Sequence, residues 1–267
     1  MGWSGDREDS ADEHRRGIEQ LEQAFVLVNQ WQTAPASMDV QPRSTLAGDD
    51  TATAPFQTSH MARHSLGVAV DHLHCLRAAI LGADSLHAWA PFTLLRSAIE
   101  SAAVAAYLLG PAQRNERVLR RLMLVREDDL DREAVDKLLG TPTEPWMLAR
   151  LARLREIAGR RPGLDPMRIG PRSKGYAAKV SAGGDATVFG GEEAVFMWRI
   201  CSGLAHGKQW ATHSMLGMHR LEQVAEGVHN VRITSDASTV ATITDGALAL
   251  VLEAQRIYSL RATSPDT

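Results

Sequence analysis

The chain has 267 residues, 44% of them hydrophobic, which is enough for one large domain or two small ones with an ordinary core. Its formal net charge of −3 argues against a general affinity for nucleic acids or membranes. Two isolated cysteines, Cys75 and Cys201, form neither a disulfide framework nor a zinc knuckle and predict a reducing compartment. The N-terminus lacks the apolar core of a signal peptide, and no apolar run approaches the ~20 residues of a membrane-spanning helix. We therefore expect a cytoplasmic protein that does not enter membranes.

The first 58 residues predict a tail, a helix and a loop. The acidic, Gly- and Ser-containing residues 1–12 predict a disordered tail ahead of a single domain over 13–262. Apolar residues at three- and four-residue steps predict a helix that begins near Ala11 and ends near Gln32. Residues 33–58 contain three prolines and no periodicity, so we expect a long loop.

The second predicted helix, from Ser59 to Gly82, carries polar residues in one narrow arc. Imidazole and carboxylate side chains at helical spacing are possible ligands of a divalent metal. The simpler interpretation is a polar stripe, because helical spacing alone creates such coincidences and no second ligand cluster completes a site. No cofactor is expected. The weak metal candidates are His60, His64, Asp71 and His74.

The third predicted helix, residues 91–110, begins at a proline and ends at Gly110. Arg96 and Glu100 stand four residues apart in this apolar, Ala-rich segment, and partly buried charges must be paired. One interpretation is an ion pair within the helix. The other is that Glu100 reaches a cation on another helix, either Arg199 or His206.

The middle of the chain predicts two charged helices and a basic stretch. Residues 113–139 alternate basic and acidic groups, as on a solvated face with salt bridges, and residues 144–158 form the fifth helix. Residues 150–179 contain seven arginines and two lysines but only two acidic residues. This basic segment is a candidate contact for an RNA backbone, although its charges could equally balance the acidic helix before it. Gly and Pro residues predict a basic loop over 159–190.

The segment from Glu192 to Ala211 is apolar and aromatic, yet it contains Arg199 and His206. Seven residues are almost two turns of an α-helix, so both side chains should share one face with Ser202 between them. We expect Trp198 and Trp210 to pack in the core or at a dimer interface rather than to stack on bases.

The C-terminal part predicts a small amount of β-structure before a last helix. Residues 218–228 suggest a short helix, and two β-branched runs over 231–244 suggest a hairpin or an extended arm. Thr244 is a suitable N-cap for a final helix from Asp245 to Leu260. The expected fold is therefore all-α, an up-and-down bundle of several helices with one hairpin or arm.

An Arg and a His on a late bundle helix, here Arg199 and His206 with six residues between them, resemble the motif of the HEPN superfamily. The third helix, LLRSAIESAAVAAYLL, also resembles the Arg- and Glu-bearing helix of HEPN-like bacterial proteins, and the likeness covers about residues 60–260 in outline. The resemblance implies a homodimer and a toxin–antitoxin or phage-defence setting, in which an antitoxin or another protein binds the chain.

The resemblance also implies a metal-independent endoribonuclease. Such cleavage needs a base for the 2′-hydroxyl proton, an acid for the leaving oxygen and a cation for the charged transition state. His206 would transfer protons and Arg199 would bind the phosphate, with two Arg–His pairs facing one dimer cleft. The supporting residues would be Glu100, Asp71, Arg96 and Ser202.

A second hypothesis is a non-catalytic scaffold or a module that binds a protein or a ligand. The nucleases of the superfamily usually place a polar residue directly after the Arg, where this chain has Ile200. In this alternative, Arg199 pairs with Glu100, and His206 donates to a backbone carbonyl near the end of the helix.

Overall fold

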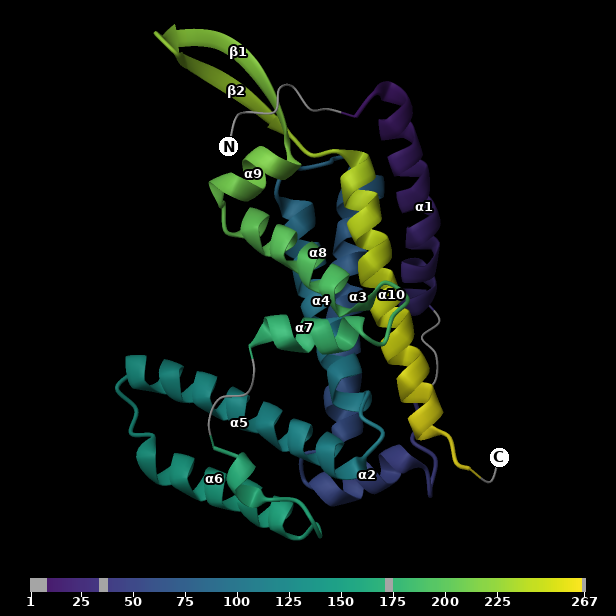
Figure 1. The fold of residues 1–267 in the computed structure, drawn as a ribbon, viewed down its shortest axis with the longest axis vertical. Coiled ribbons are helices and arrows are strands. Elements are labelled where there is room, and N and C mark those ends of the chain that lie inside the picture. Colours follow the sequence, from purple (N-terminus) through teal and green to yellow (C-terminus); the bar gives the residue numbers. More distant parts are fainter. Residues whose placement is uncertain (1–8, 34–37, 171–174, 266–267) are drawn as a thin grey trace.

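A computed structural model describes residues 9–33, 38–170 and 175–265. The described chain is mostly helical, with one antiparallel hairpin before the C-terminal helix, which confirms the predicted class (Figure 1). The helices are α1 (Ala11–Thr33), α2 (Thr45–Thr53), α3 (Thr58–Arg77), α4 (Ala90–Leu109), α5 (Arg114–Leu138), α6 (Glu144–Gly159), α7 (Tyr176–Gly184), α8 (Gly190–Ala205), α9 (Gln209–Met215) and α10 (Ala237–Ala262). The strands are β1 (Gly217–Ala225) and β2 (Val228–Thr234), and a π-helical turn over Ala78–Gly82 extends α3.

Helix α4 is the centre of the bundle and packs against α3, α7, α8 and α10, while α1 covers α3 and α10 (Figure 1). Its small residues Ala98, Ala102 and Ala105 are fully buried, so neighbouring helices approach its backbone closely. Proline 91 lies in its first turn, as predicted. Because the main apolar core surrounds α4, polar groups on α4 are held in fixed positions.

Helices α5 and α6 leave the bundle at the end opposite the hairpin (Figure 1). They have a small core of their own, which includes Val118, Leu122, Leu154, Ile157 and Ile169. Helix α5 begins beside α2, so the corner between α2, α4 and α5 fixes how this pair is attached.

Residues 33–58 are not a continuous loop as predicted, because they contain α2. The Ser44 side chain accepts a hydrogen bond from the backbone N–H of Ala47 at 3.1 Å and caps this helix. Only Leu46 and the polar residues Asp49 and Thr53 are buried in it. The helix is held by a cap and by ionic contacts rather than by an apolar stripe, so apolar periodicity gives no sign of it. Residues 34–37 of the predicted loop lie outside the described residues.

A buried ion pair joins α2 to α5. Arg117 is 2% exposed and Asp49 is 0% exposed. The guanidinium donates to both carboxylate oxygens, from Nε to Oδ2 at 2.6 Å and from Nη2 to Oδ1 at 2.9 Å. Arg114 donates to the same carboxylate from Nε at 3.0 Å. Two guanidinium groups thus neutralise one fully buried carboxylate, and bidentate geometry of this kind is the strongest form of the contact.

The same corner satisfies the carbonyl groups that follow α4. Arg117 Nη1 donates to the carbonyls of Pro111 and Ala112, at 2.8 Å each, and Arg261 of α10 donates to the carbonyls of Gly110 and Pro111 at 3.2 and 2.9 Å. Cations at the C-terminal end of a helix also interact favourably with its dipole. The corner is therefore a structural centre that combines α2, α4, α5 and α10.

The predicted basic loop over 159–190 contains a 3₁₀ turn at Pro166–Arg168 and helix α7. The glycines that suggested a loop instead allow close packing. A Cβ atom on Gly184 would lie 2.5 Å from the Cβ atom of Ala194 in α8, so only glycine fits there. Residues 171–174 lie outside the described part of the chain.

The predicted boundaries near the C-terminus are wrong, although the hairpin itself is confirmed. The predicted short helix over 218–228 falls on β1 and on the turn that leads into β2. The second β-branched run belongs to α10, which begins at Ala237 instead of Asp245. Thr244 is buried within α10 and donates its hydroxyl to the Val240 carbonyl at 2.7 Å, so it is not an N-cap. Burial against the bundle core outweighs the weak helix propensity of β-branched residues.

Residues 9–12 of the predicted tail have defined structure, and residues 1–8 lie outside the described residues. Ser10 and Glu13 form a capping box at the start of α1. The Asp9 carboxylate accepts hydrogen bonds from the backbone N–H and the hydroxyl of Ser238, at 3.0 and 2.6 Å. This contact ties the start of α1 to the start of α10.

Two helices, α4 and α10, are long and apolar enough to cross a membrane by length and composition. In each, 61% of the apolar window is buried inside the bundle. The core helices of soluble proteins pass the same test, so these two helices are weak evidence for a membrane span.

Candidate functional site

Helix α8 ends earlier than predicted, at Ala205, and the chain turns there. Gly207 has a φ of +61° and follows the C-cap residue His206. The backbone N–H of Lys208 donates to the Gly203 carbonyl at 2.8 Å, and the N–H of Gly207 donates to the Leu204 carbonyl at 3.0 Å. These two bonds form a Schellman motif, which closes a helix at a glycine. The predicted helix over 192–211 is therefore α8 and α9 joined by a tight turn.

Arg199 and His206 are both exposed at this end of α8. Neither side chain forms a hydrogen bond or an ion pair with any described residue. The Arg199 guanidinium lies 6.0 Å from the ring centroid of Trp198, the outer limit of a cation–π contact. The backbone N–H of His206 donates to the Ser202 carbonyl at 3.1 Å, which keeps the C-cap residue on the helical path. The two polar side chains are thus available to a molecule outside the chain.

Gly203 lies between Arg199 and His206 on the same face of α8, four residues after the first and three before the second. A Cβ atom on Gly203 would lie 2.8 Å from Trp210 Cζ2 and from the Ala211 Cβ atom. The indole of Trp210, which is 50% exposed, therefore packs directly on this glycine. Trp210 is therefore not packed in the core, and the other predicted place for it, a dimer interface, stays a prediction. The face holds a cation, an imidazole and a half-exposed aromatic ring; we call it the α8 face (Arg199, Gly203, His206 and Trp210).

Glu100 does not pair with Arg199 or His206. Its Oε1 accepts a hydrogen bond from Trp198 Nε1 at 2.6 Å and lies 3.0 Å from Arg96 Nε, an ion pair whose geometry is too poor for a hydrogen bond. The pairing within α4 is one of the two predicted interpretations. Glu100 is linked to the α8 face only through Trp198, the neighbour of Arg199 in the chain.

The remaining predicted supporting residues make no polar side-chain contact with the α8 face. Asp71 is exposed on α3, and among the described residues no hydrogen bond or ion pair joins it to Arg199 or His206. Ser202 is half-buried in α8. The arrangement in which Arg199 bridges to Glu100 and His206 donates to a carbonyl, which the scaffold hypothesis required, is not the one observed.

The cations of the basic segment 150–179 are mostly paired within the chain. Arg150 lies 3.1 Å from Asp129, Arg153 and Arg160 contact Glu156 at 2.7 and 2.6 Å, and Lys179 pairs with Glu127. The others donate to uncharged oxygens or to a more distant carboxylate: Arg155 to the Ile169 carbonyl, Arg161 to Asn115 and Arg168 to Glu116. Arg172 and Lys174 lie outside the described residues. The segment therefore supplies ion pairs to α5 and α6, and contact with RNA through it stays a prediction.

The predicted metal candidates do not converge. His60, His64 and Asp71 are exposed on α3, and His74 is half-buried. The described residues contain no group of three or more His, Cys, Asp or Glu side chains placed to hold one metal ion. The helical rise explains this, because fourteen residues separate His60 from His74 by about 21 Å.

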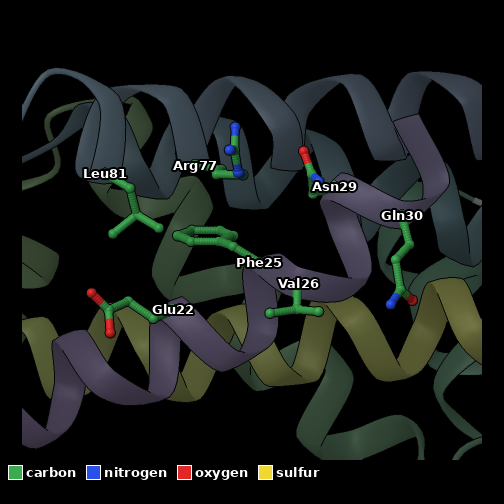
Figure 2. Close-up of a pocket in the computed structure, with 7 residues that line it drawn as sticks. All are labelled: Glu22, Phe25, Val26, Asn29, Gln30, Arg77 and Leu81. Carbon is green, nitrogen blue, oxygen red and sulfur yellow. The ribbon is translucent and has the colours of Figure 1, made fainter. Parts of the chain in front are cut away.

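The structure also contains cavities that the sequence did not indicate. One is a crevice of about 380 Å³ between α1 and the end of α3. Figure 2 shows the ring of Phe25 in its middle, with Arg77 and Leu81 above it and Val26 to its lower right. None of the predicted site residues lines this crevice.

A second cavity, of about 280 Å³, lies between α3, α4 and the start of α7. Its lining includes two residues predicted for other roles, His64 and Glu100, together with His72 and Tyr176, which the sequence did not indicate. Burial raises the pKa of the Tyr176 hydroxyl, and the negative charge of Glu100 raises it further. Sequence spacing could not find this group because it depends on how α7 crosses α4.

No family model matches the chain, and no curated protein and no solved structure matches it either.

Proposed function

We propose that the protein is a metal-independent endoribonuclease of HEPN type that acts as a homodimer through the α8 face. The observation that carries the proposal is the exposure of Arg199 and His206 on one end of α8 without polar partners among the described residues. A structural role through ion pairs or hydrogen bonds would require such partners. The exposed ring of Trp210 beside them adds a surface on which a base can stack.

The chemistry follows from these three side chains. The 2′-oxygen of RNA attacks the adjacent phosphorus, the bond to the 5′-oxygen breaks, and a cyclic phosphate and a free 5′-hydroxyl remain. A neutral imidazole takes the 2′-hydroxyl proton, and a protonated imidazole supplies a proton to the leaving 5′-oxygen. The Arg199 guanidinium stabilises the negative charge that develops on the phosphate oxygens.

The dimer follows from the number of proton transfers. One His206 cannot be base and acid in the same turnover, and no other histidine belongs to the α8 face as defined. Two copies that bring their α8 faces together provide two imidazoles and two guanidinium groups at one cleft. Ile200, which is 5% exposed, packs in the core. Phosphate binding and proton transfer therefore fall to Arg199 and His206.

The test is cleavage of mixed-sequence RNA by the purified protein in EDTA. We expect cyclic phosphate ends in the products and a loss of activity of ~10²–10⁴-fold in His206→Ala, as removal of a general acid or base gives. The matched control is His213→Ala, an exposed histidine in α9, seven residues after His206, which should leave activity unchanged. Activity that is absent in EDTA, or that survives in His206→Ala, contradicts the proposal.

The dimer is tested separately by the dependence of activity on protein concentration. Specific activity should rise with concentration and reach a plateau as dimers form. Adding an excess of His206→Ala chains to wild-type chains should lower activity below the share contributed by wild-type dimers mixing at random, because a mixed dimer keeps only one intact His206. Activity that falls only in proportion to the share of wild-type chains would contradict a shared cleft.

A further inference from the structure

The cavity between α3, α4 and α7, which we call the α4 groove, is lined mainly by hydrogen-bonding side chains. Its polar lining comprises His64, Ser65, His72, Ser97, Glu100 and Ser101, with Tyr176 at the α7 side. The volume of about 280 Å³ suits a small organic molecule rather than a polymer. The groove is built from three helices of the bundle core, so its shape is fixed by packing.

Several of these groups have hydrogen-bonding capacity that the chain does not use. His72 Nδ1 lies 2.8 Å from the Val68 carbonyl, and a carbonyl only accepts, so Nδ1 carries the proton and Nε2 is left as an acceptor. Ser65 is 4% exposed, yet its hydroxyl has no hydrogen bond to a described residue. Glu100 uses Oε1 for Trp198 and Arg96, and within the described chain Oε2 accepts no hydrogen bond.

The charge of the groove selects the class of ligand. Glu100 is the charged residue of the lining, and none of the described lining residues is Lys or Arg. Arg96, which pairs with Glu100 through Oε1, is not part of this lining, so an anion such as a phosphate or a carboxylate would face the carboxylate with no cation of the lining to bind it. The Oε2 atom accepts no hydrogen bond within the described chain, so it calls for a donor, and a charged donor forms the stronger hydrogen bond. A positively charged donor is the complement of this lining.

A metal ion does not fit the same residues. His64 and His72 are eight residues apart on α3, which places their Cα atoms about 12 Å apart along the helix. Bonds from imidazole nitrogen to zinc are only ~2 Å long, so one ion cannot easily reach both side chains and Glu100. The described chain indeed contains no group of three metal-ligating side chains. The cation must be larger than a metal ion and must carry its own hydrogen-bond donors.

We propose that the α4 groove binds a small primary amine as its ammonium ion, with the –NH₃⁺ group on Glu100 and its alkyl chain along Val68 and Val104. An ammonium group has three donors and no acceptor, which suits a carboxylate oxygen, an imidazole Nε2 and serine hydroxyls. The apolar side chains Met61, Val68 and Val104 complete the lining and fit a short alkyl chain. This site is separate from the α8 face and does not depend on nuclease activity.

The test uses n-butylammonium as the probe, with 1-butanol and butanoate as molecules of similar size that carry no charge or the opposite charge. Binding is followed by tryptophan fluorescence, because Trp198 donates to the same carboxylate, and by calorimetry. We expect saturable binding of butylammonium and at least ~10-fold weaker binding of the other two, a difference of the order expected when a charged contact is lost. Equal binding of butanoate overturns the proposal. So does equal competition by sodium chloride, whose cation has no hydrogen-bond donors, because that would indicate a general effect of salt.

Two variants locate the site. Glu100→Gln should weaken butylammonium binding at least ~10-fold. The matched control is Glu192→Gln, an exposed carboxylate in the first turn of α8, which should leave binding unchanged. Ser97→Leu narrows the groove and leaves the residues Glu100, Trp198 and Arg96 themselves unchanged, so it tests the site even if Glu100→Gln folds poorly. Undiminished binding in Ser97→Leu, with the thermal unfolding transition retained, contradicts the proposal.

Discussion

Arginines in two regions of this molecule have opposite surroundings. At the corner between α2, α4 and α5, Arg117 is 2% exposed, and its guanidinium donates to Asp49 and to two carbonyls. At the end of α8, Arg199 is exposed and forms no hydrogen bond or ion pair with the described residues. The same residue type therefore stabilises the fold in one region and faces solvent in the other. The difference teaches that the pairing of a charge, and not its presence in the sequence, indicates whether it is available for function.

The largest loss of stability is expected when the buried ion pair between Asp49 and Arg117 is broken. Asp49→Asn leaves the Arg117 guanidinium buried without its carboxylate, so the free energy of unfolding should fall by ~3–5 kcal/mol, as for other buried pairs that lose one partner. Urea unfolding followed by circular dichroism measures this change. The control is Asp245→Asn, an exposed carboxylate that accepts a hydrogen bond from Gln20, which should change stability little.

Alkylation of cysteines in Asp49→Asn shows whether the loss of stability is confined to the corner or reaches the main core. Cys201 belongs to the main core around α4, and burial raises the pKa of its thiol, so it stays protonated and unreactive at neutral pH. Cys75 is exposed and should react with iodoacetamide in every variant. If Asp49→Asn mainly loosens α2, α5 and α6, Cys201 stays protected below the unfolding transition. Rapid alkylation of Cys201 would show that the corner supports the entire bundle.

A smaller effect is expected from a change in shape at the α8 face. Gly203→Ala places a methyl group 2.8 Å from Trp210 and Ala211, and overpacking of this kind costs ~1–3 kcal/mol of the free energy of unfolding. The control variant should change the free energy of unfolding in the opposite direction. Gly67 lies in α3 with no atom within 4 Å of an added Cβ, so Gly67→Ala should stabilise the protein by ~0.5–1 kcal/mol. A neutral Gly203→Ala would mean that Trp210 moves freely from α8.

The smallest effect on stability is expected from Arg199→Ala. Its exposed side chain has no polar partner in the described structure, so the free energy of unfolding should change by less than ~0.5 kcal/mol. Thermal unfolding checks this, while the loss of RNA cleavage in the same variant checks the proposed role. A large drop in stability would place Arg199 with Arg117 as a structural residue and would remove the contrast between the two regions.

The sequence predicts the helices that an apolar stripe supports. Helices α1, α3, α4, α5 and α6 lie close to the predicted ranges because their apolar residues repeat at helical spacing and their ends carry Pro or Gly signals. Helix α2 was missed because Ser44 and Asp49 hold it through a cap and an ion pair. Helix α7 was missed because Gly184 lowers helix propensity locally but permits close contact with α8.

The candidate site shows the same limit. The spacing of Arg199 and His206 predicts one face of a helix, and both are exposed at the end of α8. Spacing could not predict that Trp210 would pack on Gly203, because that contact requires the turn at Gly207. Nor could it predict that Glu100 would bind Trp198 and line a groove with His72 and Tyr176, since these residues come from separate helices. Contacts across helices depend on how the helices cross, which local patterns do not determine.

The hairpin leaves and rejoins the bundle at a single place, because Gly217 is paired with Thr234. The first and last residues of the hairpin are therefore adjacent, so the hairpin adds length between α9 and α10 without separating them. Its outer part is largely exposed, and its tip at Glu226 and Gly227 points away from the helices (Figure 1). A fluorescent label or an affinity tag inserted at this tip would therefore report on the protein without entering its core, its α8 face or its α4 groove.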